Sequence, residues 1–261
     1  VSEVLRLSEA ERSGLTESVV RHVNGRAPVV ASVGAETTRQ AVRYARHAES
    51  AGVTAVMAVA PISVSLSDEA LAEHFRQIAS AVTIPLIVQD ASGYVGHSLP
   101  LGMYVELMDE FGYDRLMVKP EAVPIGPRLT ALQEATHGRA IVFEGTGGLM
   151  LMDSFPRGIT GTMPGAEMPW AIAAIWDHLN SGNEAAARTI HAHVAALVSL
   201  QHSLDSFIAV EKHMLVRQGV IPSARRRQPV GYDLDPMTLR EVDRLTDVLR
   251  DLCGLSPVSG L

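Results

Sequence analysis

The chain has 261 residues and a formal charge of −7 at pH 7, from 22 basic and 29 acidic side chains. Its hydrophobic content of 47% suits one large or two ordinary globular domains and excludes a disordered or fibrous chain. The excess of acidic over basic side chains argues against a nucleic-acid partner. Because no uninterrupted run of about 18 apolar residues is present, we expect no membrane-spanning helix. The only cysteine, Cys253, excludes an internal disulfide and favours a cytoplasmic location.

The predicted elements alternate between short apolar runs and longer segments of helical period. The first helix begins after Ser8, which forms a capping-box pattern with Glu11. Six strands are predicted at residues 28–33, 55–60, 85–89, 116–119, 140–143 and 158–162. A helix is predicted after each strand, at residues 37–51, 68–81, 100–110, 124–136, 148–153 and 169–179. This alternation predicts an α/β fold with a parallel sheet.

Beyond Gly182 the helical period continues without a strand, over residues 183–204, 205–218 and 236–252. We therefore predict a barrel domain over residues 1–182 and a C-terminal helical domain over residues 183–261. Strands that are apolar throughout suit either a TIM (β/α)8 barrel or a doubly wound sheet. The Gly-rich turn at 145–148 lacks the spacing of nucleotide-binding loops, which favours the barrel. Since a barrel needs eight strands, the six predicted ones indicate that the chain lacks the first two.

Lysine is rare in this chain, because only Lys119 and Lys212 occur among the 22 basic residues. Lys119 ends an apolar strand, and in a barrel this end of a strand faces the active site. Because side chains alternate between the two faces of a strand, Met117 and Lys119 lie on the same side. An amine partly withdrawn from water at this place can attack a carbonyl carbon and form a Schiff base. The alternative is a structural ion pair of Lys119 with Glu121 or Glu144.

Five segments of the chain resemble the dihydrodipicolinate synthase and N-acetylneuraminate lyase family. They are AVMAVAPISVSLS at 55–67, IPLIVQDASGYVG at 84–96, RLMVKPEA at 115–122, GITGTMPGAEMP at 158–169 and EKHMLVRQGVIPSARRRQP at 211–229. The resemblance implies a TIM barrel with a C-terminal helical domain that assembles as a homotetramer. It also implies that Lys119 forms an imine with a small 2-keto acid, without a cofactor.

The chain departs from the best-known members of that family at three positions. Gln89 replaces a tyrosine that takes a proton during retro-aldol cleavage, and an amide has no titratable proton for that task. Tyr94 replaces the arginine that reads the second substrate of dihydrodipicolinate synthases, and Ser63 replaces a second tyrosine. These departures argue against the synthase activity. A dehydration is compatible with them, because an amide hydrogen bond can orient the hydroxyl group that leaves as water.

Three further motifs most resemble the L-2-keto-3-deoxyarabonate dehydratases: QDA at 89–91, EG at 144–145 and GTM at 161–163. The resemblance implies dehydration of a 2-keto-3-deoxy sugar acid, with Lys119 as the nucleophile and Gln89 and Glu144 as further catalytic residues. The alternative to a role in the site is a structural one. In that case the side chains of Gln89, Glu144 and Thr162 close the ends of their strands by hydrogen bonds to the backbone. Glu144, Ser63 and a water are candidates for the base. The implied substrate-binding residues are Ser63, Tyr94, Gly161 and Thr162.

Two other functions stay open at this point. One is an aldolase that releases pyruvate from a 2-keto-3-deoxy sugar acid, or a condensation of the dihydrodipicolinate synthase type that uses pyruvate. The other is a non-catalytic member of the family that binds a keto acid. No metal site is expected, because His191 and His193 face different directions on one predicted helix and no HExxH pattern is present.

Overall fold

The computed structural model describes residues 3–91 and 98–256. These residues form two compact units, and each is described by itself. The first unit consists of the described residues within 3–143 and 157–161, and the second of those within 144–156 and 162–256. The predicted domain division at residue 182 is a different one and stays a prediction.

The first unit contains a parallel four-stranded sheet. Its strands lie in the order β1 (Val30–Ser32), β2 (Ala55–Val59), β3 (Leu86–Asp90) and β4 (Leu116–Pro120). The register places Gln89 of β3 directly opposite Lys119 of β4. All five residues of β3 are buried, as expected of a parallel strand covered on both faces. The predicted α/β class with a parallel sheet is confirmed.

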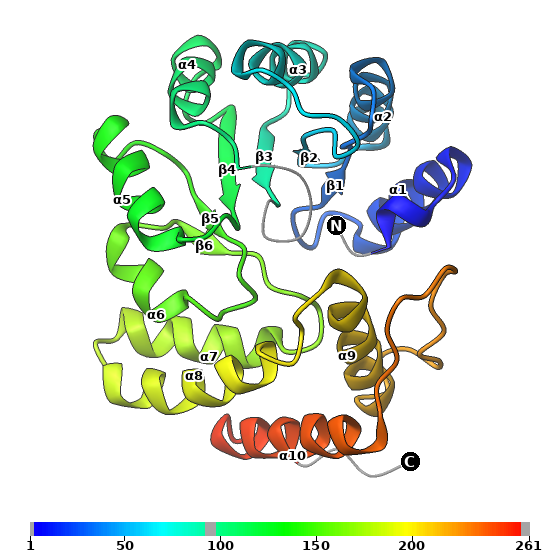
Figure 1. Ribbon diagram of the computed structural model, residues 1–261, viewed down its shortest axis with the longest axis vertical. Helices are drawn as coiled ribbons and strands as arrows, with labels where there is room; N and C mark the ends of the chain where they lie inside the picture. The colour runs from blue at the N-terminus through cyan, green and yellow to red at the C-terminus, as the bar shows by residue number, and fades with distance from the viewer. Residues whose placement is uncertain (1–2, 92–97, 257–261) are drawn as a thin grey trace. The chain divides into compact units, whose positions relative to one another are not determined.

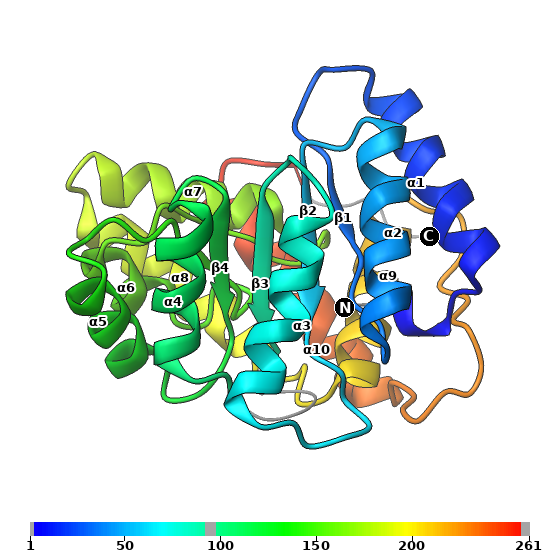
Figure 2. The ribbon, with the colours of Figure 1, turned by 90° about the horizontal axis from the view of Figure 1, so that it is seen from above.

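Five α-helices belong to the first unit. They are α1 (Glu9–Val23), α2 (Thr38–Ala51), α3 (Asp68–Ser80), α4 (Leu101–Phe111) and α5 (Ile125–Ala135), and a short 3-10 helix, η1 (Val4–Arg6), precedes α1. Ser8 begins α1 with the predicted capping box, in which its side chain accepts from the backbone of Glu11. Thr37 and Ser67 cap α2 and α3 through side-chain oxygens. In Figures 1 and 2 helices α2, α3 and α4 lie along one face of the sheet.

Five α-helices also belong to the second unit. They are α6 (Leu151–Ser154), α7 (Pro169–Asn180), α8 (Glu184–Val198), α9 (Leu204–Arg217) and α10 (Pro236–Leu252). Helix α7 packs against α8, and α8 packs against α10. Ile172 and Ile175 of α7 and Ile190 and Val194 of α8 are at most 3% exposed, so the core of this unit lies between its helices.

Two short strands, β5 (Phe143–Glu144) and β6 (Gly161–Thr162), form a second sheet, and each contributes one residue to each unit. A 3-10 helix, η2 (Phe155–Arg157), follows α6. Before β5, Val142 makes a parallel bridge to Val118 of β4. The described residues thus contain six strands, all close to their predicted positions and each followed by a helix. None of the described helices is both long and apolar enough to cross a membrane.

Candidate active site

Lys119 lies at the carboxyl end of β4, with its side chain only 11% exposed. Its Nζ atom lies 3.0 Å from Oε1 of Glu121, whose side chain is 4% exposed. Alternation along an extended chain puts residues 119 and 121 on the same side, which lets the two side chains meet. The lysine is therefore held in a buried ion pair. This is the contact expected if Lys119 has a structural role rather than a catalytic one.

Gln89 of β3 contacts the same carboxylate. It is 2% exposed, and its Nε2 donates to Oε1 of Glu121 over 2.8 Å. The register of β3 and β4 produces this arrangement, because it sets Gln89 opposite Lys119. One oxygen of Glu121 thus accepts from an amide and pairs with an ammonium group. We call Gln89, Lys119 and Glu121 the lysine cluster.

The lysine cluster can perform acid–base chemistry at the amine. A buried charge is tolerated only where a partner of opposite charge and hydrogen bonds satisfy it, and Glu121 supplies that partner. A carboxylate at hydrogen-bonding distance can also accept the proton that an amine must lose before its lone pair attacks a carbonyl. The same contact therefore serves either a structural pair or an activated nucleophile.

The sequence prediction treated Glu121 only as a structural partner of Lys119. The signal that points to a larger role is the spacing in Lys-Pro-Glu at 119–121, which places amine and carboxylate on one side of the chain. The backbone amide of Glu121 also donates to the carbonyl oxygen of Asp90 over 2.9 Å. This bond extends the pairing of β3 with β4 and fixes the position of the carboxylate.

Glu144 and Thr162 meet each other in the second unit. The Glu144 side chain is fully buried, and its Oε2 accepts from the Thr162 hydroxyl over 3.0 Å. Its Oε1 accepts from the backbone amide of Thr146 over 2.8 Å and from the Thr146 hydroxyl. The Thr162 hydroxyl also donates to the backbone oxygen of Glu144. Such bonds are expected if Glu144 and Thr162 serve only to close the ends of their strands, without contacting a substrate.

The other predicted site residues lie elsewhere. Ser63 is exposed, and its hydroxyl and backbone amide donate to the carboxylate of Glu36. Partial burial alone would raise the pKa of Glu36, but hydrogen bonds from Ser63 and from the Ile62 amide hold it below its usual value. Gly161 begins β6. Tyr94 lies outside the described residues.

Metal ligands do not gather in the part of the chain that the structure describes. There, no group of three or more histidine, cysteine, aspartate or glutamate side chains is placed to hold a metal ion. The groups that can carry chemistry in these residues are thus the amine, amide and carboxylate of the lysine cluster, together with the carboxylate and hydroxyls around Glu144.

The chain is similar to known proteins of one family. A model of the dihydrodipicolinate synthetase family matches residues 2–249. The 4-hydroxy-tetrahydrodipicolinate synthase of Chlorobium luteolum is 27% identical over 263 aligned residues, which cover 93% of this chain and 81% of that protein. The similarity therefore extends well beyond the segment around Lys119.

The fold is similar to that of solved structures in the same group. The 4-hydroxy-tetrahydrodipicolinate synthase of Methylacidiphilum fumariolicum SolV superposes with a TM-score of 0.85 at 22% identity, covering 97% of this chain and 83% of that one. The dihydrodipicolinate synthase of Acinetobacter baumannii, described as chloride-inhibited and complexed with pyruvate, gives a TM-score of 0.81 at 25% identity, covering 97% and 84%.

These matches extend over nearly the whole chain and identify its α/β fold with that of the TIM-barrel synthases. They do not support the expectation that two strands are missing before the first helix. The family expected from the sequence motifs is confirmed, and the chain belongs to the dihydrodipicolinate synthetase family.

Proposed function

We propose that the protein is a lyase that binds a small 2-keto acid as an imine on Lys119 and dehydrates a 2-keto-3-deoxy sugar acid. The observation that carries the proposal is the buried Lys119 amine at a strand end, 3.0 Å from a carboxylate that also binds Gln89. The pyruvate complex of the Acinetobacter baumannii synthase supports the choice of a 2-keto acid.

The first step requires an uncharged amine. In this proposal Glu121 accepts a proton from Nζ of Lys119, and the freed lone pair attacks the carbonyl carbon of the keto acid. Loss of one water then gives the imine. Because the protonated imine nitrogen withdraws electrons from C2, the neighbouring C3 becomes acidic.

The second step removes water from the substrate. A base takes a proton from C3, and the C4 hydroxyl leaves with a proton as water. In a 2-keto-3-deoxypentonate a proton then moves from C5 to C3, and the resulting C4–C5 enol loses its hydroxyl proton and gains one at C4 to become the C5 aldehyde. Hydrolysis of the imine consumes the water released in the first step and restores Lys119, so the net change is the loss of one water. The amide of Gln89 orients the leaving hydroxyl, which needs a hydrogen bond rather than a titratable group.

Three residues compete for the role of base at C3. Glu121 joins the candidates because its carboxylate lies beside the amine that carries the substrate. Glu144 is fully buried and keeps its place as a candidate, although hydrogen bonds from Thr146 and Thr162 engage both of its oxygens. Ser63 is the weakest of the three, since it is exposed and bound to Glu36.

Borohydride trapping with pyruvate tests the imine. The chain has only two lysines, so peptide mass spectrometry distinguishes the two side-chain adducts directly. We expect the reduced adduct on the peptide that contains Lys119, its loss in Lys119→Arg, and its persistence in the control Lys212→Arg. If the folded protein forms no adduct at Lys119, this residue has only a structural role in its ion pair. The result would favour a non-catalytic protein that binds a keto acid.

The absence of a tyrosine at position 89 supports the choice of a dehydratase over an aldolase. A 2-keto-3-deoxypentonate should yield a semialdehyde product without free pyruvate, because no phenol is present there to accept the C4 hydroxyl proton. Coupling to lactate dehydrogenase detects free pyruvate. Its steady release would establish the aldolase instead, and consumption of pyruvate with an aldehyde partner would establish a condensation.

A further inference from the structure

A cavity lies in the first unit, on the face of the sheet opposite the lysine cluster. Its volume is about 250 Å³, and residues of β3, β4, α4 and α5 line it. Asp90 and Val118 reach this cavity, whereas their chain neighbours Gln89 and Lys119 belong to the other face, because side chains alternate along a strand. We call this cavity the α4–α5 pocket. It is therefore separate from the proposed catalytic site.

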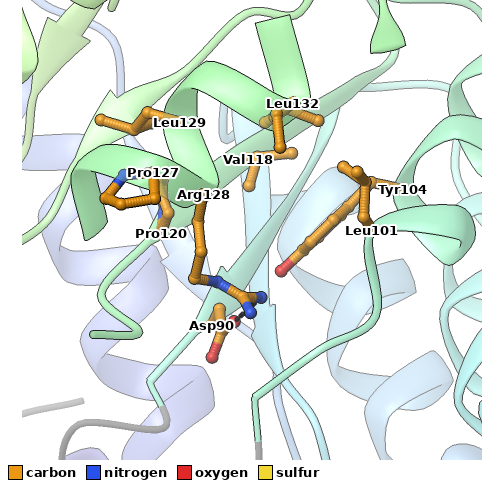
Figure 3. Close-up of a pocket in the computed structure, with 10 residues that line it drawn as sticks. Asp90, Leu101, Tyr104, Val118, Pro120, Pro127, Arg128, Leu129 and Leu132 are labelled. Carbon is orange, nitrogen blue, oxygen red and sulfur yellow. Dashed lines mark hydrogen bonds and ion pairs between the residues drawn. The ribbon is translucent and has the colours of Figure 1, made fainter. Parts of the chain in front are cut away.

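The walls of the α4–α5 pocket are mostly apolar. Val118, Leu129 and Leu132, which Figure 3 labels, line the pocket and are at most 4% exposed. Two other lining residues are partly exposed, Leu101 at 37% and the Arg128 side chain at 33%. A cavity with apolar walls and a few convergent polar groups is the usual form of a small-molecule site.

Two charged side chains in the pocket neutralise each other. Nη2 of Arg128 lies 3.2 Å from Oδ2 of Asp90 and donates to the backbone oxygen of Leu99 over 2.6 Å. Asp90 is 1% exposed, and its Oδ2 also accepts from the backbone amide of Leu99 over 3.1 Å. The pair therefore has fixed geometry and no net charge, which makes a second carboxylate beside Asp90 unfavourable.

Tyr104 supplies a polar group that its surroundings do not satisfy. It is 4% exposed, and its buried hydroxyl has no hydrogen-bond partner among the described residues. In Figure 3 this hydroxyl points toward the guanidinium group of Arg128, which cannot accept a hydrogen bond. Burial raises the pKa of Tyr104 well above its usual value, and the charge of Asp90 acts in the same direction. The hydroxyl therefore keeps its proton. It lies near the Asp90 carboxylate but makes no well-formed hydrogen bond to a described residue, so it can still donate to a ligand.

We propose that the α4–α5 pocket binds a small uncharged molecule that has an apolar body and a carbonyl oxygen. The carbonyl oxygen accepts from the Tyr104 hydroxyl, and the apolar body packs against Val118, Leu129 and Leu132. The neutral Arg128–Asp90 pair favours an amide or ketone over an anion of the same shape. This site goes beyond the proposed lyase activity and does not depend on it.

Benzamide, benzoate and toluene form a matched set of probes. They share an aromatic ring, but only benzamide combines a carbonyl oxygen with zero charge. We expect benzamide to shift the NMR signals of the Val118 and Leu132 methyl groups in a saturable way, with benzoate binding at least fivefold more weakly. Pyruvate should not displace benzamide, because the two sites lie on opposite faces of the sheet.

Tyr104→Phe removes the hydroxyl and keeps the ring. It should raise the Kd of benzamide at least fivefold and leave that of toluene unchanged. Tyr113→Phe is the control, since the Tyr113 hydroxyl binds Asp109 and Arg139 and Tyr113 does not line the pocket. The proposal fails if benzamide leaves the two methyl signals unmoved, if it binds Tyr104→Phe as tightly as the wild type, or if pyruvate displaces it.

Discussion

Gln89 and Lys119 lie directly opposite each other on β3 and β4, and both contact Oε1 of Glu121, at 2.8 Å and 3.0 Å. The amide and the amine are thus joined through a single carboxylate oxygen. A change at Glu121 therefore affects both residues, whereas a change at Gln89 leaves the ion pair in place. This difference separates the first two predictions.

Replacing Glu121 by Gln should weaken both stability and imine formation. The Lys119 ammonium loses its buried counter-charge, and removing one partner of a buried pair costs about 3–5 kcal/mol of unfolding free energy. We also expect borohydride trapping with pyruvate to slow at least tenfold, because the proton acceptor is gone. Glu73→Gln, in an exposed pair with Arg76, is the control and should leave both measurements unchanged. A folded Glu121→Gln protein that traps pyruvate at the wild-type rate would show that Glu121 takes no proton from Lys119.

Replacing Gln89 by Leu should separate binding from turnover. Leucine is close to glutamine in size, and the Lys119–Glu121 pair stays in place, so trapping with pyruvate should remain within a few-fold of wild type. Dehydration should fall at least tenfold, because the leaving hydroxyl loses its hydrogen bond. Borohydride trapping, read by mass spectrometry, measures imine formation, and the appearance of the semialdehyde measures dehydration. An equal loss in both would place Gln89 in a purely structural role.

Glu167 should make the stability of the second unit depend on pH. Its side chain is buried, Oε1 accepts from Gln201 over 3.1 Å, and Oε2 has no hydrogen-bond partner among the residues that the structure describes. Burial raises the pKa of Glu167 to about 6, and the charge of Glu211 acts in the same direction. The folded protein thus binds the proton more tightly than the unfolded chain. The tighter proton binding contributes its full stabilisation at pH values below the pKa of Glu167 in the unfolded chain. As pH rises through about 6, the folded protein loses this contribution, about 2 kcal/mol of unfolding free energy.

Glu167→Gln tests this dependence because an amide of the same shape does not titrate. The variant should be more stable than wild type by about 2 kcal/mol at pH 8, with the gap narrowing to about 1 kcal/mol or less at pH 5. Urea unfolding at the two pH values measures it. A gap of the same size at both would show that the ionisation of Glu167 does not control stability.

Gly148→Ala should destabilise the helical core of the second unit. Gly148 has φ +94°, and a Cβ atom there would overlap Cδ1 of Ile172 and lie 3.2 Å from Cγ1 of Val194. Backbone strain and overpacking together should cost about 2–3 kcal/mol in urea unfolding. Gly182→Ala is the matched control, because Gly182 has φ +75° but no atom within 4 Å of the added carbon, so only about 1 kcal/mol is expected. Equal losses in the two variants would contradict the packing argument.

Local patterns predicted the helices well and the short strands less well. The helix predicted at residues 37–51 is observed at Thr38–Ala51, since its apolar period and its cap at Thr37 are local properties. The strand predicted at 140–143 is observed at Phe143–Glu144, because its paired length depends on β6, far away in the chain. The motifs around Lys119 identified the family, but the bond between Ser63 and Glu36 was not predictable from them.

The sequence by itself determined the α/β class, the family and the place of Lys119 at a strand end, because periodicity, capping and motif spacing act over a few residues. Only the tertiary structure decided that Gln89 and Lys119 share the carboxylate of Glu121 and that Tyr104 faces the Arg128–Asp90 pair in a cavity. These contacts join residues of different strands and helices. Strand register and helix packing set their geometry, and neither is written in the pattern of any one segment.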